Sequence, residues 1–209
     1  ETPTHPTQGA IWYPALNPAN AVEGVTYEFN YLPELGVLPI EGKSLIDAAP
    51  DESGGPYPLI LFVHGLGHFW SASFWLCEHL ASYGFVVLAG DQLDNQGAEA
   101  GREAGITRAE EVTWQIDYAA SLTDDTGLLP GLIDLARVAV AGVSFGGYTA
   151  LLAGGAQFNW DYYDAWCQEN RERTYAPNFG GMNLCDAMNV RYPLARLAHV
   201  DASQAGLWP

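Results

Sequence analysis

Hydrophobic and polar positions along the middle of the chain follow two alternating patterns. Continuous apolar runs of strand length occur at residues 59–63 (LILFV), 85–89 (FVVLA) and 137–141 (RVAVA). Such runs are typical of strands that are buried on both faces, as in a parallel sheet. Apolar residues recur at helical spacing at 71–83, 109–122 and 146–154. The alternation predicts an α/β fold, a three-layer α/β/α sandwich with right-handed crossovers.

The two ends of the chain have different patterns. The first 57 residues are rich in Pro, Gly and Asn and contain short strand-like runs at 9–13 and 25–31. We interpret them as edge strands and surface loops. Residues after 155 are polar and aromatic, with no run of the buried-strand type. We therefore expect one domain over 1–209, divided into N-terminal strands and loops (1–57), a core (58–155) and a helical insertion or lid (156–209).

The strongest motif is Gly-Val-Ser-Phe-Gly at 142–146, which fits G-x-S-x-G between an apolar strand and a helix of small residues. In such a turn the serine is strained, and the glycines let strand and helix pack closely. The Ser144 Oγ then stands clear of the sheet, and the Phe145 N–H points at a developing oxyanion. We predict Ser144 as a nucleophile. The alternative is a glycine-rich turn with an incidental serine.

A second motif, His-Gly-Leu-Gly at 64–67, directly follows the strand at 59–63. In this topology the loop supplies a second N–H to the oxyanion hole, and we assign it to the backbone of Leu66. We expect His64 to anchor the loop rather than to react. His68 and Phe69 come next along the chain and are candidates for lining a substrate pocket. The alternative is an ordinary turn at the end of a strand.

A serine nucleophile needs a histidine base and an acid that orients it. In this fold both follow the serine, each after a later strand. One histidine follows Ser144, namely His199, and no strand precedes it, so we interpret it as a surface or helix-face residue. Four acids after Ser144 also lack a preceding strand and are not assigned: Asp161, Asp164, Asp186 and Asp201.

The strand at 137–141 would have an open apolar edge if no neighbour followed it, and natural proteins avoid such edges. We therefore expect that the C-terminal strands of the fold are missing from this chain. The hypothesis is that a C-terminal segment or a second polypeptide completes the sheet and supplies the acid and the base.

Four stretches together resemble the predicted dienelactone hydrolases, which are α/β-hydrolases allied to platelet-activating-factor acetylhydrolase and to cutinase-like polyester hydrolases. They are Trp-Tyr-Pro at 12–14 and the segments 47–67, 80–95 and 137–155. The resemblance covers about residues 10–155 and again 206–209. It implies an α/β-hydrolase fold and a serine ester hydrolase. Dienelactone hydrolase itself has a cysteine nucleophile, so the resemblance does not imply lactone specificity here.

The resemblance also implies roles for single residues. Ser144 matches the nucleophile, and the N–H groups of Leu66 and Phe145 match the oxyanion hole. In such relatives a further strand, the acid and the histidine follow, and these positions have no match in this chain. The first strand ahead of the Trp-Tyr-Pro segment also has no match.

Composition excludes several classes of partner. The formal net charge is −17, from 25 acidic and 8 basic residues. Such a surface repels phosphate backbones, so we expect no nucleic-acid partner. No apolar run approaches the roughly 18 residues that span a bilayer. The sequence has no P-loop, dinucleotide fingerprint or CxxC. The loop with Asp91, Asp94 and Asn95 lacks the full calcium-site pattern, so we expect no metal and no cofactor.

The three cysteines indicate the compartment. Cys167 and Cys185 bracket a polar, aromatic segment, which predicts a disulfide in an oxidising environment; the alternative is two unpaired thiols. Cys77 lies in an apolar helical stretch and is predicted to be a buried free thiol. The chain begins at Glu1 without a signal peptide, which fits a processed, exported protein or a shortened one. We expect a secreted or periplasmic location.

The expected function is hydrolysis of carboxylic esters through an acyl-enzyme on Ser144, of a lipase-, acetylhydrolase- or polyesterase-like kind. The substrate partner is an ester. The alternative is a non-catalytic protein of the same fold that binds a ligand or a partner. The intact elbow and oxyanion glycines favour the enzyme, because a binding module does not need a strained turn.

Overall fold

The computed structural model of the chain describes most of the residues before 186. The described residues are 8–21, 24–29, 36–92, 104–157, 159–176, 182–183 and 185. All three predicted buried strands lie in this part of the chain. None of the helices in these ranges is long and apolar enough to cross a membrane.

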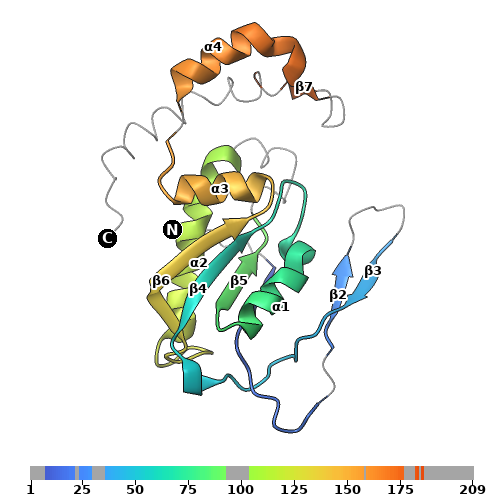
Figure 1. The fold of residues 1–209 in the computed structure, drawn as a ribbon, viewed down its shortest axis with the longest axis vertical. Helices are drawn as coiled ribbons and strands as arrows, with labels where there is room; N and C mark the ends of the chain where they lie inside the picture. Colours follow the sequence, from blue (N-terminus) through green and yellow to red (C-terminus); the bar gives the residue numbers. More distant parts are fainter. Residues whose placement is uncertain are drawn as a thin grey trace.

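A four-stranded sheet forms the centre of the fold, in the order β1-β5-β4-β6 (Figure 1). Its strands are β1 (Gly9–Trp12), β4 (Tyr57–Val63), β5 (Val86–Gly90) and β6 (Ile133–Gly142). β4 pairs in parallel with both β5 and β6, whereas β1 runs antiparallel to β5. The three apolar runs are therefore parallel strands, as predicted. β6 is longer than its run because its pairing with β4 continues past a register shift between Pro58 and Leu59.

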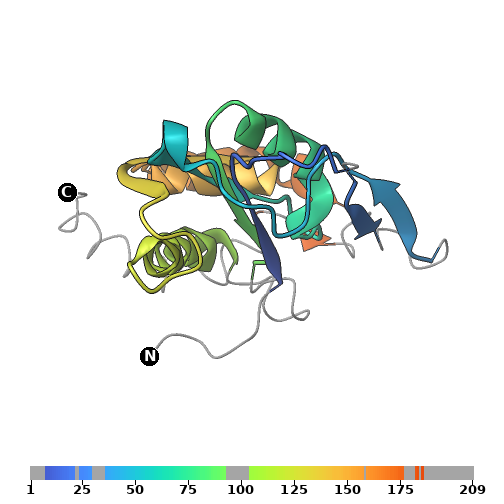
Figure 2. The ribbon, with the colours of Figure 1, turned by 90° about the horizontal axis from the view of Figure 1, so that it is seen from below.

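Helices cover both faces of the sheet, so the fold has the predicted three layers. Alternate residues of β4 divide between two cores: Leu59, Leu61 and Val63 pack with α2, and Ile60 and Phe62 pack with α1. Figure 2 shows these two helices on opposite sides of the strands. A strand that is apolar at every position serves both cores, because successive side chains point to opposite faces. The helices are α1 (Phe74–Ser82), α2 (Ala104–Thr123) and α3 (Phe145–Ala153).

The helix predicted over 71–83 has two parts. It begins as the 3-10 turn η3 (Trp70–Ser73) and continues as α1. Gly84 follows with a φ of 88°, in the left-handed conformation that commonly ends a helix. The helix predicted over 109–122 lies within the longer α2, which begins five residues earlier and ends one residue later. A short 3-10 turn, η2 (Glu52–Gly54), precedes β4.

A separate two-stranded hairpin packs over the α1 layer. β2 (Thr26–Phe29) pairs antiparallel with β3 (Leu38–Glu41), and only β2 is predicted from the sequence. β3 escapes prediction because Pro39 lies inside its short run, and all four of its residues are exposed. The Trp12 indole donates to the Tyr27 hydroxyl (2.9 Å), and the Tyr27 ring stacks on Phe74 at 4.1 Å. These contacts fix the hairpin to β1 and α1.

Residues after α3 form a small disulfide-closed unit. The Asn159 side chain caps its helix by accepting from the Tyr162 N–H. A Cys167–Cys185 disulfide closes the unit, as predicted, and Cys77 is a buried free thiol, also as predicted. In Figure 1, α4 lies beyond α3, on the side toward which the β6 arrow points. The elements are α4 (Trp160–Asn170), η6 (Arg171–Thr174), β7 (Tyr175–Ala176) and β8 (Met182–Asn183).

Replacing a side chain of the doubly packed β4 tests this core. Leu61 has no exposed surface. We expect Leu61→Ala to lower the free energy of unfolding by about 2–5 kcal/mol, since the cavity and the lost burial add. Leu128, which is 80% exposed, is the matched control. Leu128→Ala is expected to change stability by less than about 0.5 kcal/mol in urea unfolding. Equal losses in the two variants would contradict this packing.

Candidate active site

The G-x-S-x-G segment makes a sharp turn between β6 and α3. Ser144 lies at its tip with φ 54° and ψ −118°, outside the regions that non-glycine residues ordinarily occupy. Its side chain is exposed. The Gly146 N–H donates to the Val143 carbonyl oxygen (2.9 Å) and the Gly147 N–H to that of Ser144 (3.0 Å), so the turn is closed by its own backbone. The predicted strained strand–helix turn is present.

Two glycines allow this turn to approach the end of β4. A Cβ on Gly146 would overlap the Val63 carbonyl oxygen and lie 2.8 Å from that of His64. A Cβ on Gly142 would lie 2.7 Å from the Val63 carbonyl oxygen. Backbone atoms cannot move aside for these contacts, so both positions require glycine. The close packing of strand and helix predicted around the two glycines is therefore present.

The loop after β4 is held through His64, which is 2% exposed. Its Nε2 accepts the Gln92 backbone N–H (3.1 Å), so Nδ1 carries the proton and donates to the Gly65 carbonyl oxygen (2.7 Å). Because both ring nitrogens are engaged in backbone hydrogen bonds, His64 anchors the loop, in agreement with its expected role.

Residues of the loop and the turn meet around Gly65. A Cβ on Gly65 would lie 3.4 Å from the Ser144 Cβ and 3.4 Å from the His68 Cδ2. The structure thus brings His68 to the side of Ser144. Leu66 is 40% exposed at the tip of the loop. Phe145 is the first residue of α3, a position where a backbone N–H has no acceptor within its own helix. Phe145 thus directly follows Ser144 in the turn, and Leu66 directly follows Gly65, the loop residue next to the Ser144 Cβ.

The segment that follows His68 is tied to the end of β5. The Trp70 N–H donates to the Asp91 carboxylate (2.7 Å). Burial raises the pKa of the Asp91 carboxyl, while this hydrogen bond acts in the opposite direction. The Phe69 ring packs edge-on against Phe29 of the hairpin at 5.3 Å. Asp91 thus serves to position the segment that carries His68 and Phe69.

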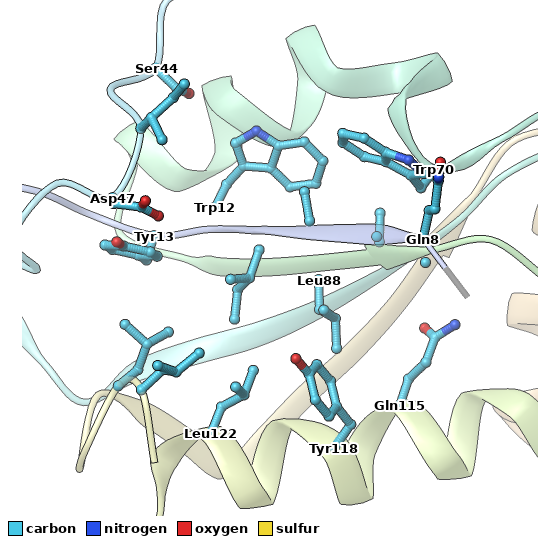
Figure 3. Close-up of a pocket in the computed structure, with 18 of the residues that line it drawn as sticks. Gln8, Trp12, Tyr13, Ser44, Asp47, Trp70, Leu88, Gln115, Tyr118 and Leu122 are labelled. Carbon is cyan, nitrogen blue, oxygen red and sulfur yellow. The ribbon is translucent and has the colours of Figure 1, made fainter. Parts of the chain in front are cut away.

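A cavity of about 1080 Å³ lies elsewhere, along the edge strand β1 (Figure 3). Trp12 and Trp70 lie on one side of β1, and Leu88, Tyr118 and Leu122 on the other. Neither Ser144 nor the predicted pocket residues His68 and Phe69 line it. The cavity is therefore not the site beside the strained turn.

Arg108 on α2 lies beside both candidate segments and was not predicted from the sequence. The side chain is 1% exposed, its Nη1 donates to the His64 carbonyl oxygen (2.7 Å), and its Cζ lies 5.0 Å from the centre of the Phe145 ring. One feature of the sequence could have identified this residue. Arg108 is spaced four residues from Val112 and eleven from Ala119, both fully buried, so it falls on the apolar face of a helix.

Several residues weighed from the sequence either lie on α4 or fall outside the described residues. Asp161 is exposed and Asp164 is half-buried, both on α4. His199, Asp186, Asp201, Asp94 and Asn95 lie outside the described residues. Within the described ranges, no group of three or more His, Cys, Asp or Glu side chains is arranged to hold a metal. Burial raises the pKa of the Cys77 thiol to about 12, so it stays protonated at neutral pH and is a poor nucleophile.

The close approach of turn and strand can be tested with two neighbouring glycines. Gly146→Ala should lower the free energy of unfolding by at least about 1–3 kcal/mol, because its methyl group collides with backbone. A Cβ on Gly147 would meet only the Gly142 carbonyl oxygen at 3.5 Å, an ordinary contact. Gly147→Ala should be neutral or stabilising by up to about 1 kcal/mol. The idea fails if chemical unfolding gives both variants the same stability.

Comparison with known proteins gives three matches. A family model described as chlorophyllase matches residues 32–160. Platelet-activating factor acetylhydrolase of Cavia porcellus is 29% identical over 143 residues, which cover 49% of this chain and 33% of that protein. A ferulic acid esterase structure from Streptomyces cinnamoneus has a TM-score of 0.49 and 22% identity, over 70% of this chain and 47% of that one.

The chain therefore spans about a third of the acetylhydrolase and about half of the esterase. The expected resemblance to platelet-activating-factor acetylhydrolase is confirmed, although the family model that matches is not that of the dienelactone hydrolases. By name, one of these relatives is an acetylhydrolase and the other an esterase. Because the family model matches more than half of the residues, this chain belongs to the chlorophyllase family.

Proposed function

We propose that this chain carries the nucleophile and the oxyanion hole of a serine hydrolase that cleaves carboxylic esters. The observation that carries the proposal is the backbone of Ser144, at φ 54° and ψ −118° on an exposed strand–helix turn. Strain of this kind costs about 1–3 kcal/mol and persists where the surroundings enforce it, most often at functional sites. The names of the relatives, an acetylhydrolase and a ferulic acid esterase, support ester chemistry.

In the proposed reaction the Ser144 Oγ attacks the carbonyl carbon of the ester, and a base takes its proton. The carbonyl oxygen becomes an oxyanion that accepts hydrogen bonds from the backbone N–H groups of Leu66 and Phe145. The C–O bond to the alcohol then breaks, and the alcohol leaves with the proton from the base. Water attacks the acyl-enzyme by the same steps, releasing the acid and restoring the Ser144 hydroxyl.

We propose that the base and the acid come from outside the described residues, on a further segment or on a second chain. The support is the free edge of β6. In the described sheet β6 pairs only with β4, and Leu135 on it is 37% exposed. A strand added in parallel along β6 would cover this edge. Its carboxyl end would then lie at the same end of the sheet as Ser144.

His68 has a different proposed role. It lies beside Ser144 but precedes it in the chain, whereas the base follows the nucleophile in this fold. We assign His68, with Phe69, to the wall of the pocket that receives the ester. The Asp91 hydrogen bond to the Trp70 N–H holds this wall in place.

The proposed location is secreted or periplasmic. The support is the Cys167–Cys185 disulfide, since such bonds form and persist in oxidising compartments.

Labelling with a fluorophosphonate probe tests the nucleophile. We expect the protein to react at Ser144, and Ser144→Ala to abolish labelling and lower kcat by about 10³-fold or more, because no other group can form the acyl-enzyme. Ser121→Ala is the control, since Ser121 is an exposed hydroxyl on α2 that donates to its own helix. A protein that stays unlabelled in the presence of the segment or chain that supplies the base would instead support the non-catalytic alternative, in which the fold binds a ligand or partner.

The role of His68 is tested by His68→Ala. A pocket residue should change KM and substrate preference, while the rate of labelling at Ser144 stays within about tenfold. The base of the reaction would behave differently: its removal should lower kcat about as much as removal of the nucleophile, because the two act as one unit. A loss of that size in His68→Ala would assign the base to His68 and contradict the proposed wall.

A further inference from the structure

Arg108 is a fully buried cation that the proposed reaction does not yet use. Its side chain is 1% exposed and is the largest of the fully buried side chains. A buried charge is costly unless hydrogen bonds and opposite charge compensate it. Glu111, 4% exposed, lies three residues further along α2, a spacing that places both residues on one face of the helix. Retention of so costly a group calls for a reason beyond filling space.

The first contact of Arg108 is with the oxyanion loop. Its Nη1 donates to the His64 carbonyl oxygen at 2.7 Å, a charge-assisted hydrogen bond. The His64 ring is already held by the Gln92 N–H and the Gly65 carbonyl oxygen. The residue two positions before Leu66 is therefore fixed both through its ring and through its backbone. This leaves the loop little freedom to tilt the Leu66 N–H.

The second contact of Arg108 is with the turn. The guanidinium carbon lies 5.0 Å from the centre of the Phe145 ring, within the range of a cation–π interaction. The other neighbour of that ring is Tyr148 on α3, stacked at 5.2 Å with an interplanar angle of 24°. The Phe145 side chain is thus held between α2 and α3, and its position fixes the residue whose N–H is the second donor.

We propose that Arg108 is a positioning residue that sets the two oxyanion donors at a fixed separation. One guanidinium reaches from α2 to the loop after β4 and to the start of α3, the two segments that carry Leu66 and Phe145. The planar guanidinium can lie over the Phe145 ring while one of its N–H groups donates to the His64 carbonyl oxygen. A lysine offers a point charge without that face, so it can replace the hydrogen bond but not the stacking. This inference rests on the proposed function.

The test compares Arg108→Met and Arg108→Lys with the unchanged protein, using a carboxylic ester and a trifluoromethyl ketone inhibitor that adds to the serine as a tetrahedral oxyanion. In Arg108→Met, kcat should fall by about 10–100-fold, somewhat less than when an oxyanion donor is removed outright. The affinity for the ketone should fall by a similar factor, while KM changes less than about threefold. Arg108→Lys should recover part of both losses.

Arg137→Gln is the matched control. Arg137 is an exposed arginine whose Nη2 donates to the Pro56 carbonyl oxygen, at the opposite end of β4 from the loop. The Arg137→Gln variant should leave kcat and the ketone affinity unchanged. Phe145→Leu, which keeps the backbone N–H but removes the ring, should give a smaller fall in kcat and ketone affinity, and it serves if Arg108→Met does not fold.

Two results would overturn the positioning role. One is a folded Arg108→Met with unchanged kcat and ketone affinity. The other is a fall in kcat that parallels the fall in melting temperature across the variants, while the ratio of ketone affinity to KM stays unchanged. That pattern is expected for a residue with a purely structural role. Either result leaves the proposed function standing if the unchanged protein is labelled at Ser144. An unchanged protein that neither reacts with fluorophosphonate nor cleaves esters, in the presence of the segment or chain that supplies the base, would instead refute the proposed function.

Discussion

The close approach of the G-x-S-x-G turn to the last peptide of β4 is the constraint on which the rest of the site depends. Gly142 and Gly146 lack side chains where a Cβ would meet the Val63 carbonyl oxygen. This contact lets α3 begin directly against the sheet, and the short path between β6 and α3 leaves Ser144 no relaxed conformation. The strain at Ser144 is thus maintained by backbone packing two residues away on either side, not by any bond of the serine itself.

The same approach brings the loop after β4 against the turn. His64 and Gly65 follow Val63 directly, so any shift of the turn would move the loop as well. The loop is stabilised independently by the His64 ring, which accepts from Gln92 at the end of β5. The segments that follow β4, β5 and β6 are therefore held together at one end of the sheet by hydrogen bonds and close packing. Ester hydrolysis, as proposed, would use groups held by all three.

Much of this arrangement was predictable because it depends on local patterns. The strands at 59–63, 85–89 and 137–141 are apolar at almost every position, since each is packed on two faces, and the elbow glycines are fixed by contacts between segments with strong sequence signals. β3 was not predictable, because its four residues are exposed and Pro39 interrupts its short run. The cavity along β1 was not predictable either, since its lining comes from several distant segments.

Arg108 illustrates a third limit. Its place on the apolar face of α2 is visible in the sequence, yet a pattern of hydrophobic and polar positions treats an arginine there as an exception rather than as a contact. Its two partners, the His64 carbonyl oxygen and the Phe145 ring, lie 44 and 37 residues away and are joined only by the fold. A buried charge is informative because its desolvation cost must be offset at one particular place. In this chain that place is the gap between the two segments that carry the candidate oxyanion donors.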